Sequence, residues 1–455
     1  MVLPDLNYKQ FTGALRNYFA QAGKTPRAMV VTYGCQQNIS DSEIIKGLLS
    51  LCGYTFCDSY NEADLVVFNT CAVREHAELR VYGNIGALKP VKKSRPDLKI
   101  AVCGCMMQQQ QVQNEIKTKY RHVDIVFGPS LIYKFPEMLF KSVLEGQKIF
   151  DRSENPDIIE GLPVQRAKNN KAWVTVMYGC NNFCTYCIIP YARGRVRSRK
   201  PESVIKQAKE LVAKGYVEIV LTGIHTAGYG EDLENYSFYD LLVDLTKIEG
   251  LKRLRISSIE TSQITDDIID LISKSKIIVD HLHVPLQAGC DETLNRMNRK
   301  YNCEQYYEKL SKIRRLIPDI VFTTDVIVGF PGESEEEFEK TYEFIKKVGY
   351  TQLHVFPYSM RKGTPAARMV QVDEKIKHER VNRLIALSHE LNENYAKSQI
   401  GKTLRVLFEK EDHGYYVGHG DNYLLIKVQS DEQLIGQLKN VIIDSYDEML
   451  IGRVV

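Results

Sequence analysis

The chain has 455 residues, of which 44% are hydrophobic and 26% are charged, a composition typical of globular proteins with about two to four domains. Its net charge of +3 is too small to attract a nucleic acid through bulk charge alone, so such a partner would need a local basic patch. The sequence shows no export signal and no apolar run of membrane-spanning length, so we expect a cytoplasmic protein without a membrane anchor. In that compartment its 11 cysteines should be reduced thiols or metal ligands.

Apolar runs alternate with helical patterns over residues 1–150. Ser40, Asp41 and Glu43 form a capping signal for the first helix after a strand, and this helix should end at Gly53. Strand–helix–strand order predicts right-handed crossovers and an open parallel sheet. Strands are expected at residues 28–34, 63–70, 98–104 and 122–128.

Three cysteines, Cys35, Cys71 and Cys105, each follow a different strand of this sheet. Because the carboxyl ends of parallel strands lie along one edge, where ligands bind, the three thiols can converge. The alternative is three buried structural thiols, since free cysteine packs well as a small apolar residue. Cys103 points in the same direction as Cys105 but lies inside the apolar run, so we favour Cys105.

Residues 151–171 are polar and contain two prolines, as expected of a linker. Six strand–helix units follow, and such repeated alternation predicts a partly closed parallel barrel with its site on the loops after the strands. The strands are expected at residues 172–179, 217–223, 251–260, 281–287, 320–330 and 352–359.

The loop after the first barrel strand, GCNNFCTYC, carries Cys180, Cys184 and Cys187 at C-x3-C-x2-C spacing, and no further Cys or His follows before His225. Structural zinc needs four protein ligands, and an electron-transfer iron–sulfur cluster normally has four cysteines. Three soft thiolates therefore favour an iron–sulfur cluster with one open iron over zinc.

Other strand ends carry pocket candidates, namely Gly223, Ser258 and Glu260. The turn GFPGE adds Gly329 and Gly332, where a ligand could approach the backbone closely at a helix N-terminus. A turn capped by its own glutamate explains GFPGE nearly as well. We expect the histidines in this region to pack or to form hydrogen bonds, because none has metal-ligand spacing to the cysteines: His225, His281 and His283.

Five basic residues lie between Arg193 and Lys200, directly after the cysteine loop. They either form a solvated face or hold a phosphate backbone. Farther on, a helical pattern over residues 372–399 precedes five short strand patterns that predict a small antiparallel barrel. Its tyrosines can stack on bases or pack in the core: Tyr415, Tyr416 and Tyr423.

The fold class is therefore α/β. We expect an N-terminal open parallel-sheet domain at residues 1–150, a linker at 151–171, a partial (β/α)6 barrel at 172–395 and a C-terminal antiparallel β-barrel at 396–455.

CNNFCTYC resembles the signature of radical S-adenosylmethionine (SAM) enzymes, in which an aromatic residue, here Tyr186, precedes the last cysteine. With TYGCQQN, VVFNTC and VCGC ahead of it and a small β-domain behind, nearly the whole chain resembles a radical methylthiotransferase. That family has a cysteine-bearing N-terminal domain, a radical SAM barrel and a C-terminal TRAM domain. The resemblance implies two [4Fe-4S] clusters, each with an open iron: one on Cys35, Cys71 and Cys105, and one on Cys180, Cys184 and Cys187.

The resemblance also implies a mechanism. The barrel cluster would bind SAM and cleave it to a 5′-deoxyadenosyl radical, and the N-terminal cluster would hold a sulfur that a second SAM methylates. An electron donor of the flavodoxin or ferredoxin type would supply the electron to a monomeric enzyme. We expect the SAM pocket to involve Tyr186, Gly223, Ser258, Glu260, Gly329 and Gly332.

The implied substrate is carbon 2 of an N6-modified adenosine beside the anticodon, in the tRNA anticodon stem-loop. YGCQQN, VYGNIGALK and IEGLPVQR look like enzymes acting on N6-isopentenyladenosine, although those usually have Met in place of Gln37. LTGIHTAGYGED and HVFPYSMRKGTPAA look like enzymes acting on N6-threonylcarbamoyladenosine. The longer uninterrupted resemblance favours the isopentenyl substrate. Methylthiolation of a ribosomal protein and non-catalytic iron–sulfur electron transfer are further alternatives.

Overall fold

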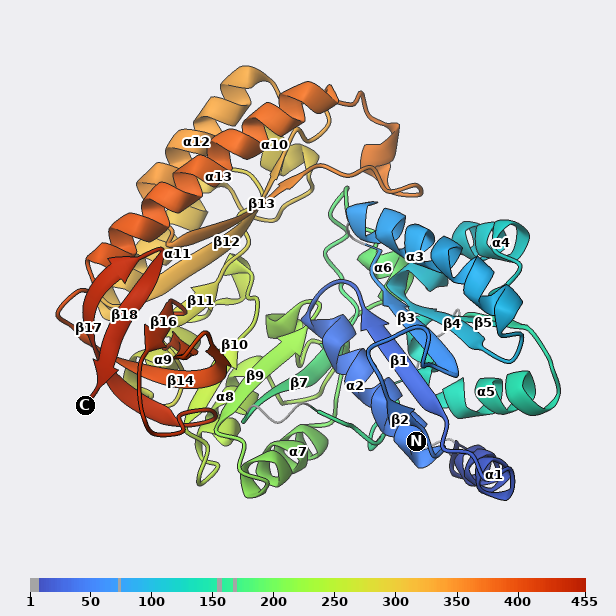
Figure 1. Cartoon of the computed structure of the whole chain (residues 1–455). Helices are drawn as coiled ribbons and strands as arrows, with labels where there is room; N and C mark the ends of the chain where they lie inside the picture. The colour runs from blue at the N-terminus through green and yellow to red at the C-terminus, as the bar shows by residue number, and fades with distance from the viewer. Residues whose placement is uncertain (1–7, 73–74, 154–157, 167–169) are drawn as a thin grey trace. The chain divides into compact units, whose positions relative to one another are not determined.

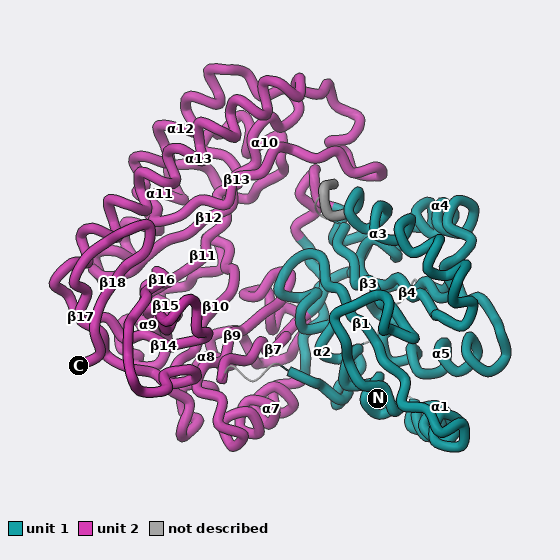
Figure 2. Tube along the Cα trace, viewed as in Figure 1, with its two compact units in different colours: residues 1–167, 178–181, 188–199 teal, residues 168–177, 182–187, 200–455 magenta. Residues whose placement is uncertain are grey.

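The computed structural model describes residues 8–72, 75–153, 158–166 and 170–455, so parts of the expected linker lie outside the described residues. The chain forms two compact units, shown in Figure 2. Unit 1 contains residues 1–167, 178–181 and 188–199, and unit 2 contains residues 168–177, 182–187 and 200–455. The expected barrel and the expected C-terminal domain both lie in unit 2, and a boundary at residue 396 stays a prediction.

Unit 1 is built on a parallel sheet, as the alternating pattern predicted (Figure 1). All neighbouring strands of this sheet pair in parallel, and the short outer strands β2 and β6 were not expected from the sequence. Within the described residues the order is β2 (Thr55–Phe56), β1 (Arg27–Thr32), β3 (Leu65–Thr70), β4 (Lys99–Gly104), β5 (Ile125–Phe127) and β6 (Ile149–Asp151).

Helices cover both faces of this sheet. Val67 of β3 points into one apolar core and the adjacent Phe68 into the other, because successive strand residues face opposite sides. Every residue of β3 is buried, which explains why the strand begins with four consecutive apolar residues. The first core includes α1 (Tyr8–Gln21), α2 (Gln36–Leu51) and α5 (Phe135–Leu144), and the second includes α3 (Glu75–Ser94) and α4 (Gln110–Lys119).

Helix α2 begins earlier than its capping signal indicated. Cys35 is the N-cap residue and makes no side-chain cap, whereas Ser40, Asp41 and Glu43 lie buried inside the helix. The two carboxylates are used for tertiary contacts, Asp41 with Arg193 and Glu43 with Arg166. The capping prediction was therefore wrong, because polar groups that pair with distant residues resemble caps in the sequence.

Unit 2 contains the expected partial (β/α)6 barrel. Strands β7, β9 and β10 are neighbours, as are β11, β12 and β13, and a parallel bridge between Leu254 and Ile278 links the two groups. Their bounds are β7 (Lys171–Tyr178), β9 (Glu218–Gly223), β10 (Arg253–Ile256), β11 (His281–His283), β12 (Val321–Val328) and β13 (Gln352–Pro357).

Amphipathic helices lie between the barrel strands and after them. Three of these begin with capping boxes, at Ser237, Asn302 and Ser334, whose side chains bond the first backbone N–H groups and so define the helix starts. No helix in the described part of the chain combines the length and the apolarity needed to cross a bilayer. The helices are α7 (Pro201–Ala213), α8 (Phe238–Thr246), α9 (Asp266–Lys274), α10 (Asp291–Arg296), α11 (Cys303–Leu316), α12 (Glu335–Val348) and α13 (Glu374–Lys397).

The C-terminal strands of unit 2 close into a small barrel in the order β14-β15-β16-β18-β17. Its pairs are antiparallel except for the parallel pair β16–β18. Tyr423 stacks between His281 and His419, at centroid distances of 4.4 and 5.1 Å, so packing rather than base stacking accounts for this residue. The strands are β14 (Thr403–Asp412), β15 (Tyr415–Gly420), β16 (Leu425–Val428), β17 (Leu438–Asp447) and β18 (Met449–Val454).

Candidate iron–sulfur sites

The N-terminal cysteine trio lies at the carboxyl edge of the unit 1 sheet. Cys71 follows β3 directly, Cys105 follows β4 directly, and Cys35 lies between β1 and α2. Burial raises the pKa of the Cys105 thiol to about 12; Arg193 opposes this shift, and the charges of Cys71 and Cys35 add to it. The order of the elements thus brings the three cysteines to one edge of the sheet, as the sequence predicted.

Two glycines make this convergence possible. Gly34 precedes Cys35 at φ 119°, and a Cβ there would lie 2.5 Å from Cβ of Cys71. Gly104 precedes Cys105 at φ 98°, and a Cβ there would lie 2.3 Å from the Thr70 carbonyl oxygen. Both positions combine a left-handed backbone with a close approach, so only glycine is tolerated.

A buried amide network fixes the strand ends around the trio. Asn69 donates to the Asn38 carbonyl at 2.8 Å and to the Ser42 hydroxyl at 2.9 Å, while Asn38 donates to the Thr70 carbonyl at 3.1 Å. These bonds connect β3 to the first turns of α2. Because every partner is buried or partly buried, breaking one bond would leave an unpaired polar group and loosen the site.

Arg193 places a buried positive charge against this trio. It ends α6 (Ile189–Arg193), donates from Nε to Cys105 Sγ at 2.9 Å, and pairs with Asp41 at 2.6 Å. Its side chain is 3% exposed, and Gln37 donates to the other carboxylate oxygen of Asp41 at 3.0 Å. Burial alone would lower the guanidinium pKa, but Asp41, Cys105 and Cys35 hold it above the usual value. A permanent cation beside three thiols fits a thiolate-bound iron–sulfur cluster.

The basic run after the cysteine loop exposes fewer cations than its sequence indicates. Arg193 is buried, and Arg199 is buried beside Glu160 at 3.0 Å. Arg197 is partly buried and donates to the Arg193 carbonyl at 2.5 Å. The exposed cations of the run are Arg195 and Lys200. Two arginines assigned to a possible phosphate-binding patch are therefore committed to internal ion pairs.

The second trio lies in the loop after β7. Cys180 belongs to unit 1, where its N–H donates to the Gly194 carbonyl at 3.1 Å. Cys184 and Cys187 belong to unit 2, where the Cys187 N–H donates to the Cys184 carbonyl at 2.9 Å. The short C-x3-C-x2-C connection keeps the three residues in one covalent loop.

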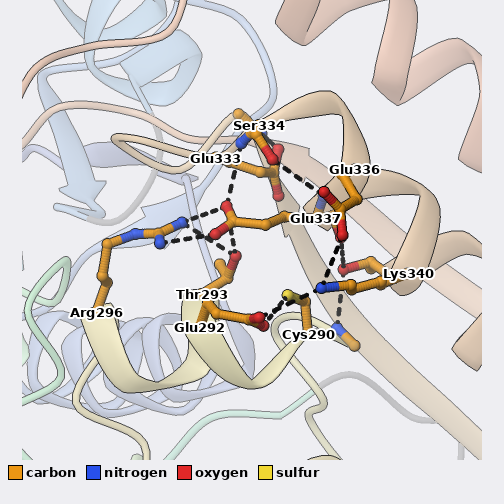
Figure 3. Close-up of polar contacts among 12 residues, drawn as sticks. Cys290, Glu292, Thr293, Arg296, Glu333, Ser334, Glu336, Glu337 and Lys340 are labelled. Atoms are coloured by element: carbon orange, nitrogen blue, oxygen red, sulfur yellow. Dashed lines mark hydrogen bonds and ion pairs between the residues drawn. The ribbon is translucent and has the colours of Figure 1, made fainter.

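Residues at the end of α10 hold the unit 2 part of this loop. Thr185 donates its hydroxyl to the Arg296 carbonyl at 2.8 Å and its N–H to the Met297 carbonyl at 3.1 Å, and Asn298 donates to the Phe183 carbonyl at 3.1 Å. Figure 3 shows how α10 is anchored in turn. Arg296 pairs with both oxygens of Glu337 on α12, at 2.9 and 2.5 Å.

Arg299 donates a hydrogen bond to Cys184, as Arg193 does to Cys105. It donates to Cys184 Sγ at 3.2 Å and lies 3.5 Å from Glu260, with a side chain 6% exposed. Glu260 also accepts from Asn182 of the loop at 2.5 Å. Both trios thus have one thiol bonded to a buried arginine whose charge is balanced by a buried carboxylate.

Tyr186 and the GFPGE turn lie together in unit 2. The Tyr186 ring meets Phe330 edge to face at 6.4 Å, and Phe330 is the second residue of the turn. Gly329 and Gly332 have φ values of 66° and 78°, which the turn requires. Glu333 accepts the Gly329 N–H at 2.6 Å and an Arg380 hydrogen at 2.8 Å, and burial raises its pKa to about 7.

The other pocket candidates follow their strands as expected. Gly223 ends β9, and a Cβ there would lie 2.9 Å from the Met177 side chain. Ser258 lies half-buried two residues after β10. His225 hydrogen-bonds Gln263 at 2.6 Å, His281 bonds Arg255 at 3.2 Å and His283 bonds Thr323 at 2.9 Å, so the expectation of hydrogen-bonding histidines is confirmed for all three.

Sequence reasoning missed the roles of Arg193, Arg299 and Asp41. Arg193 was grouped with its basic neighbours, and Arg299 is far from its cysteine in the sequence.

Comparisons with known proteins show the family of the chain. Residues 174–345 match the Radical SAM superfamily, and residues 27–128 match a family described as "Uncharacterized protein family UPF0004". The chain is 46% identical to a tRNA-2-methylthio-N(6)-dimethylallyladenosine synthase of Alkaliphilus oremlandii, covering 95% of this chain and 93% of that protein. A protein of the same name from Acetivibrio thermocellus is 42% identical, covering 97% and 92%.

Solved structures support the fold alone. The radical S-adenosylmethionine methyltransferase TsrM from Kitasatospora setae, with cobalamin and a [4Fe-4S] cluster bound, aligns with a TM-score of 0.54 at 14% identity. The alignment covers 75% of this chain and 77% of that one.

Proposed function

Since the chain belongs to the tRNA-2-methylthio-N(6)-dimethylallyladenosine synthase family of radical SAM enzymes, we propose that it transfers a methylthio group to carbon 2 of N6-dimethylallyladenosine in tRNA. Dimethylallyl and isopentenyl name the same N6 substituent, so this is the reaction favoured from the sequence. The observation that carries the proposal is the pair of cysteine trios, each with its own buried arginine.

We assign one [4Fe-4S] cluster to each trio. SAM is the further cofactor. Cys180, Cys184 and Cys187 would hold the cluster that supplies the electron for reductive cleavage of SAM, and Cys35, Cys71 and Cys105 would hold the cluster that supplies the transferred sulfur. Such radical chemistry suits carbon 2 of adenine, an unactivated position that acid–base groups cannot functionalise.

The chain's own residues orient and balance these thiolates. Arg193 and Arg299 donate N–H groups to Cys105 and Cys184, which stabilises negative charge on sulfur. Asp41 and Glu260 hold the two guanidinium groups in place. Burial of these pairs limits the access of water, so their electrostatic effect exceeds that of exposed pairs.

Positioning of the barrel loop depends on α10 and on the GFPGE turn. The backbone and hydroxyl bonds of Thr185 fix the loop between Cys184 and Cys187. We propose that Tyr186 and Glu260, with the glycine turn, form part of the SAM pocket. The remaining members of the proposed pocket are Gly223, Ser258, Gly329 and Gly332.

The proposed partner is the anticodon stem-loop of tRNA, with a flavodoxin- or ferredoxin-type protein as the electron donor. We further propose a monomer that acts in the cytoplasm, and a TRAM-like role for the C-terminal barrel. Because the described basic run exposes chiefly Arg195 and Lys200, tRNA binding needs additional cations elsewhere on the surface.

The decisive experiment uses the anaerobically reconstituted enzyme, SAM, a reductant and two synthetic anticodon stem-loops. One stem-loop carries N6-dimethylallyladenosine, and the other carries N6-threonylcarbamoyladenosine. We expect mass spectrometry to show a methylthio group on the first, and none with the matched Cys184→Ala control. Modification of only the second stem-loop, or of neither, would reject the proposed substrate.

A further inference from the structure

Three neighbouring strands of the central barrel bring two imidazoles and a carboxylate together. His283 ends β11, Asp325 lies in β12, and His354 lies in β13. One ligand atom from each residue lies within 4.8 Å of the others, and His283 Nε2 is 3.3 Å from Asp325 Oδ2. All three side chains are only partly buried, so small solutes can reach them.

Strand register brings these residues to one place. Asp325 is the direct neighbour of His354 across the β12–β13 ladder, and His283 is the neighbour of Thr323 across β11–β12. Thr323 and Asp325 share one face of β12, because side chains alternate along a strand. Groups fixed on adjacent strands hold their geometry better than groups on loops.

Thr323 supplies the support that a metal-binding imidazole needs. Its hydroxyl lies 2.9 Å from His283 Nδ1 and 2.9 Å from His281 Nε2. Arg255 can only donate, so its bond to His281 Nδ1 places the proton of neutral His281 on Nε2. The Thr323 oxygen can also accept a hydrogen from His283 Nδ1, and the tautomer with its proton on Nδ1 leaves Nε2, which lies beside Asp325, able to bind a metal.

We propose that His283, Asp325 and His354 bind a divalent first-row cation such as Zn²⁺, at a site distinct from both cysteine trios. With bonds of about 2.0–2.1 Å, ligand atoms of a tetrahedral ion lie about 3.3 Å apart. The His283–Asp325 separation of 3.3 Å already fits this geometry, and the ligand atom of His354 lies within 4.8 Å of both. Nitrogen and oxygen ligands select such an ion, whereas the cysteine trios select iron–sulfur clusters.

Three protein ligands leave a coordination position of a tetrahedral ion open, where water or an oxygen atom of a bound molecule can complete the shell. This inference goes beyond the proposed function and does not depend on it. The histidine spacing in the sequence did not predict the site, because its ligands come from three separate strands.

The test uses the holoenzyme with both iron–sulfur clusters in place, so that the six cluster cysteines are occupied. The protein is incubated with zinc chloride, separated from free zinc by gel filtration, and assayed for bound zinc by mass spectrometry. We expect one zinc per chain in the wild type, and an at least tenfold weaker affinity in His354→Gln and in Asp325→Asn. His413→Gln, which changes a 99% exposed histidine, is the matched control and should bind zinc normally.

Cobalt(II) gives a second readout. Nitrogen and oxygen ligation predicts visible d–d bands without the thiolate-to-cobalt charge-transfer band that stray cysteines would produce. Iron content and the melting temperature of each variant establish that it is folded. The proposal is overturned if the wild type retains no zinc, if both variants bind as tightly as the wild type, or if the cobalt spectrum shows thiolate ligation.

Discussion

The guanidinium of Arg193 donates from Nε to Sγ of Cys105 across 2.9 Å, with its other side held by Asp41. An arginine in this position neutralises negative charge that a thiolate-bound cluster would bring into the protein interior. Removing the N–H···S bond should therefore disfavour the more negative, reduced state of that cluster.

Arg193→Lys keeps the charge but cannot reproduce the planar fork that joins Cys105 to Asp41. We expect a more negative reduction potential for the N-terminal cluster, measured by a redox titration followed by electron paramagnetic resonance. The background should be a variant that lacks the barrel cluster. Arg195→Lys, at an exposed position of the same run, is the control, and equal potentials in the two variants would contradict the role of Arg193.

Arg193 and Asp41 should also be coupled in stability. Removing one partner of a buried ion pair leaves an uncompensated charge and typically costs about 3–5 kcal/mol. Arg193→Met and Asp41→Leu should therefore each destabilise the protein strongly, while the double variant should lose less than the sum. Urea unfolding of all three variants measures the coupling, and additive losses would show that the pair is not coupled.

Gly104→Ala should prevent assembly of the N-terminal site, because its Cβ would collide with the Thr70 carbonyl oxygen and φ is 98°. We expect the iron content to fall by one cluster, while SAM cleavage at the barrel site continues. Gly86→Ala in α3 is the matched control, since a Cβ there meets nothing within 4 Å. A full iron complement in Gly104→Ala would refute the proposed geometry.

Arg296 should affect the cleavage of SAM only through the position of the cysteine loop. Arg296→Met breaks the bidentate pair with Glu337 that anchors α10, and so releases the carbonyls that hold Thr185 (Figure 3). A small displacement of the cysteine loop can cost up to about 100-fold in rate, and we expect 5′-deoxyadenosine formation to fall by at least tenfold. Lys340→Met is the control, because it removes only solvent-exposed pairs with Glu292 and Glu336. Equal rates in both variants would argue against the positioning role.

Glu43 gives a pH-dependent prediction. Burial raises its pKa to about 7 from a normal 4.5, against the opposing charges of Arg166 and Lys46. Between these pH values the folded chain holds a proton that the unfolded chain has released, so stability should fall as pH rises through this range and then level off. Glu43→Gln should reduce the slope of this dependence in urea unfolding between about pH 5 and 7, and Glu333, whose pKa burial also raises to about 7, should maintain the remainder. An unchanged slope would contradict the raised pKa.

Much of the fold follows from local patterns. The strands that precede Cys71 and Cys105 each contain a short apolar run, and each thiol follows its strand directly, so their shared edge could be inferred without coordinates. The six barrel strands were likewise marked by apolar runs between amphipathic helices. Short strands such as β2 and β6 carry too few residues for a periodic signal, and the parallel β16–β18 pair depends on closure of the barrel.

The side-chain pairs around the thiols could not be inferred in the same way. Arg193 and Asp41 are 152 residues apart, and Arg299 and Cys184 are 115 apart. No periodicity specifies such pairs, since they depend on how the helices pack onto the strands. For the same reason the sequence left both base stacking and packing open for Tyr423, and the fold shows packing between two histidines.

We assign radical chemistry to the barrel loop and sulfur chemistry to the sheet edge. Variants at the two sites should therefore lose different products. Cys105→Ala should still form 5′-deoxyadenosine from SAM but should lose methylthio transfer to the stem-loop. Cys184→Ala should form no 5′-deoxyadenosine at all. Liquid chromatography with mass spectrometry measures both products, and an unchanged yield of methylthiolated RNA from Cys105→Ala would show that Cys105 is not a ligand.

The most direct test of the account is Mössbauer spectroscopy of the iron-57 enzyme, reconstituted without oxygen, as wild type and as two triple alanine variants. We predict two [4Fe-4S] clusters in the wild type and one in each variant, lacking either Cys35, Cys71 and Cys105 or Cys180, Cys184 and Cys187. A single cluster in the wild type, or two clusters in either triple variant, would contradict it.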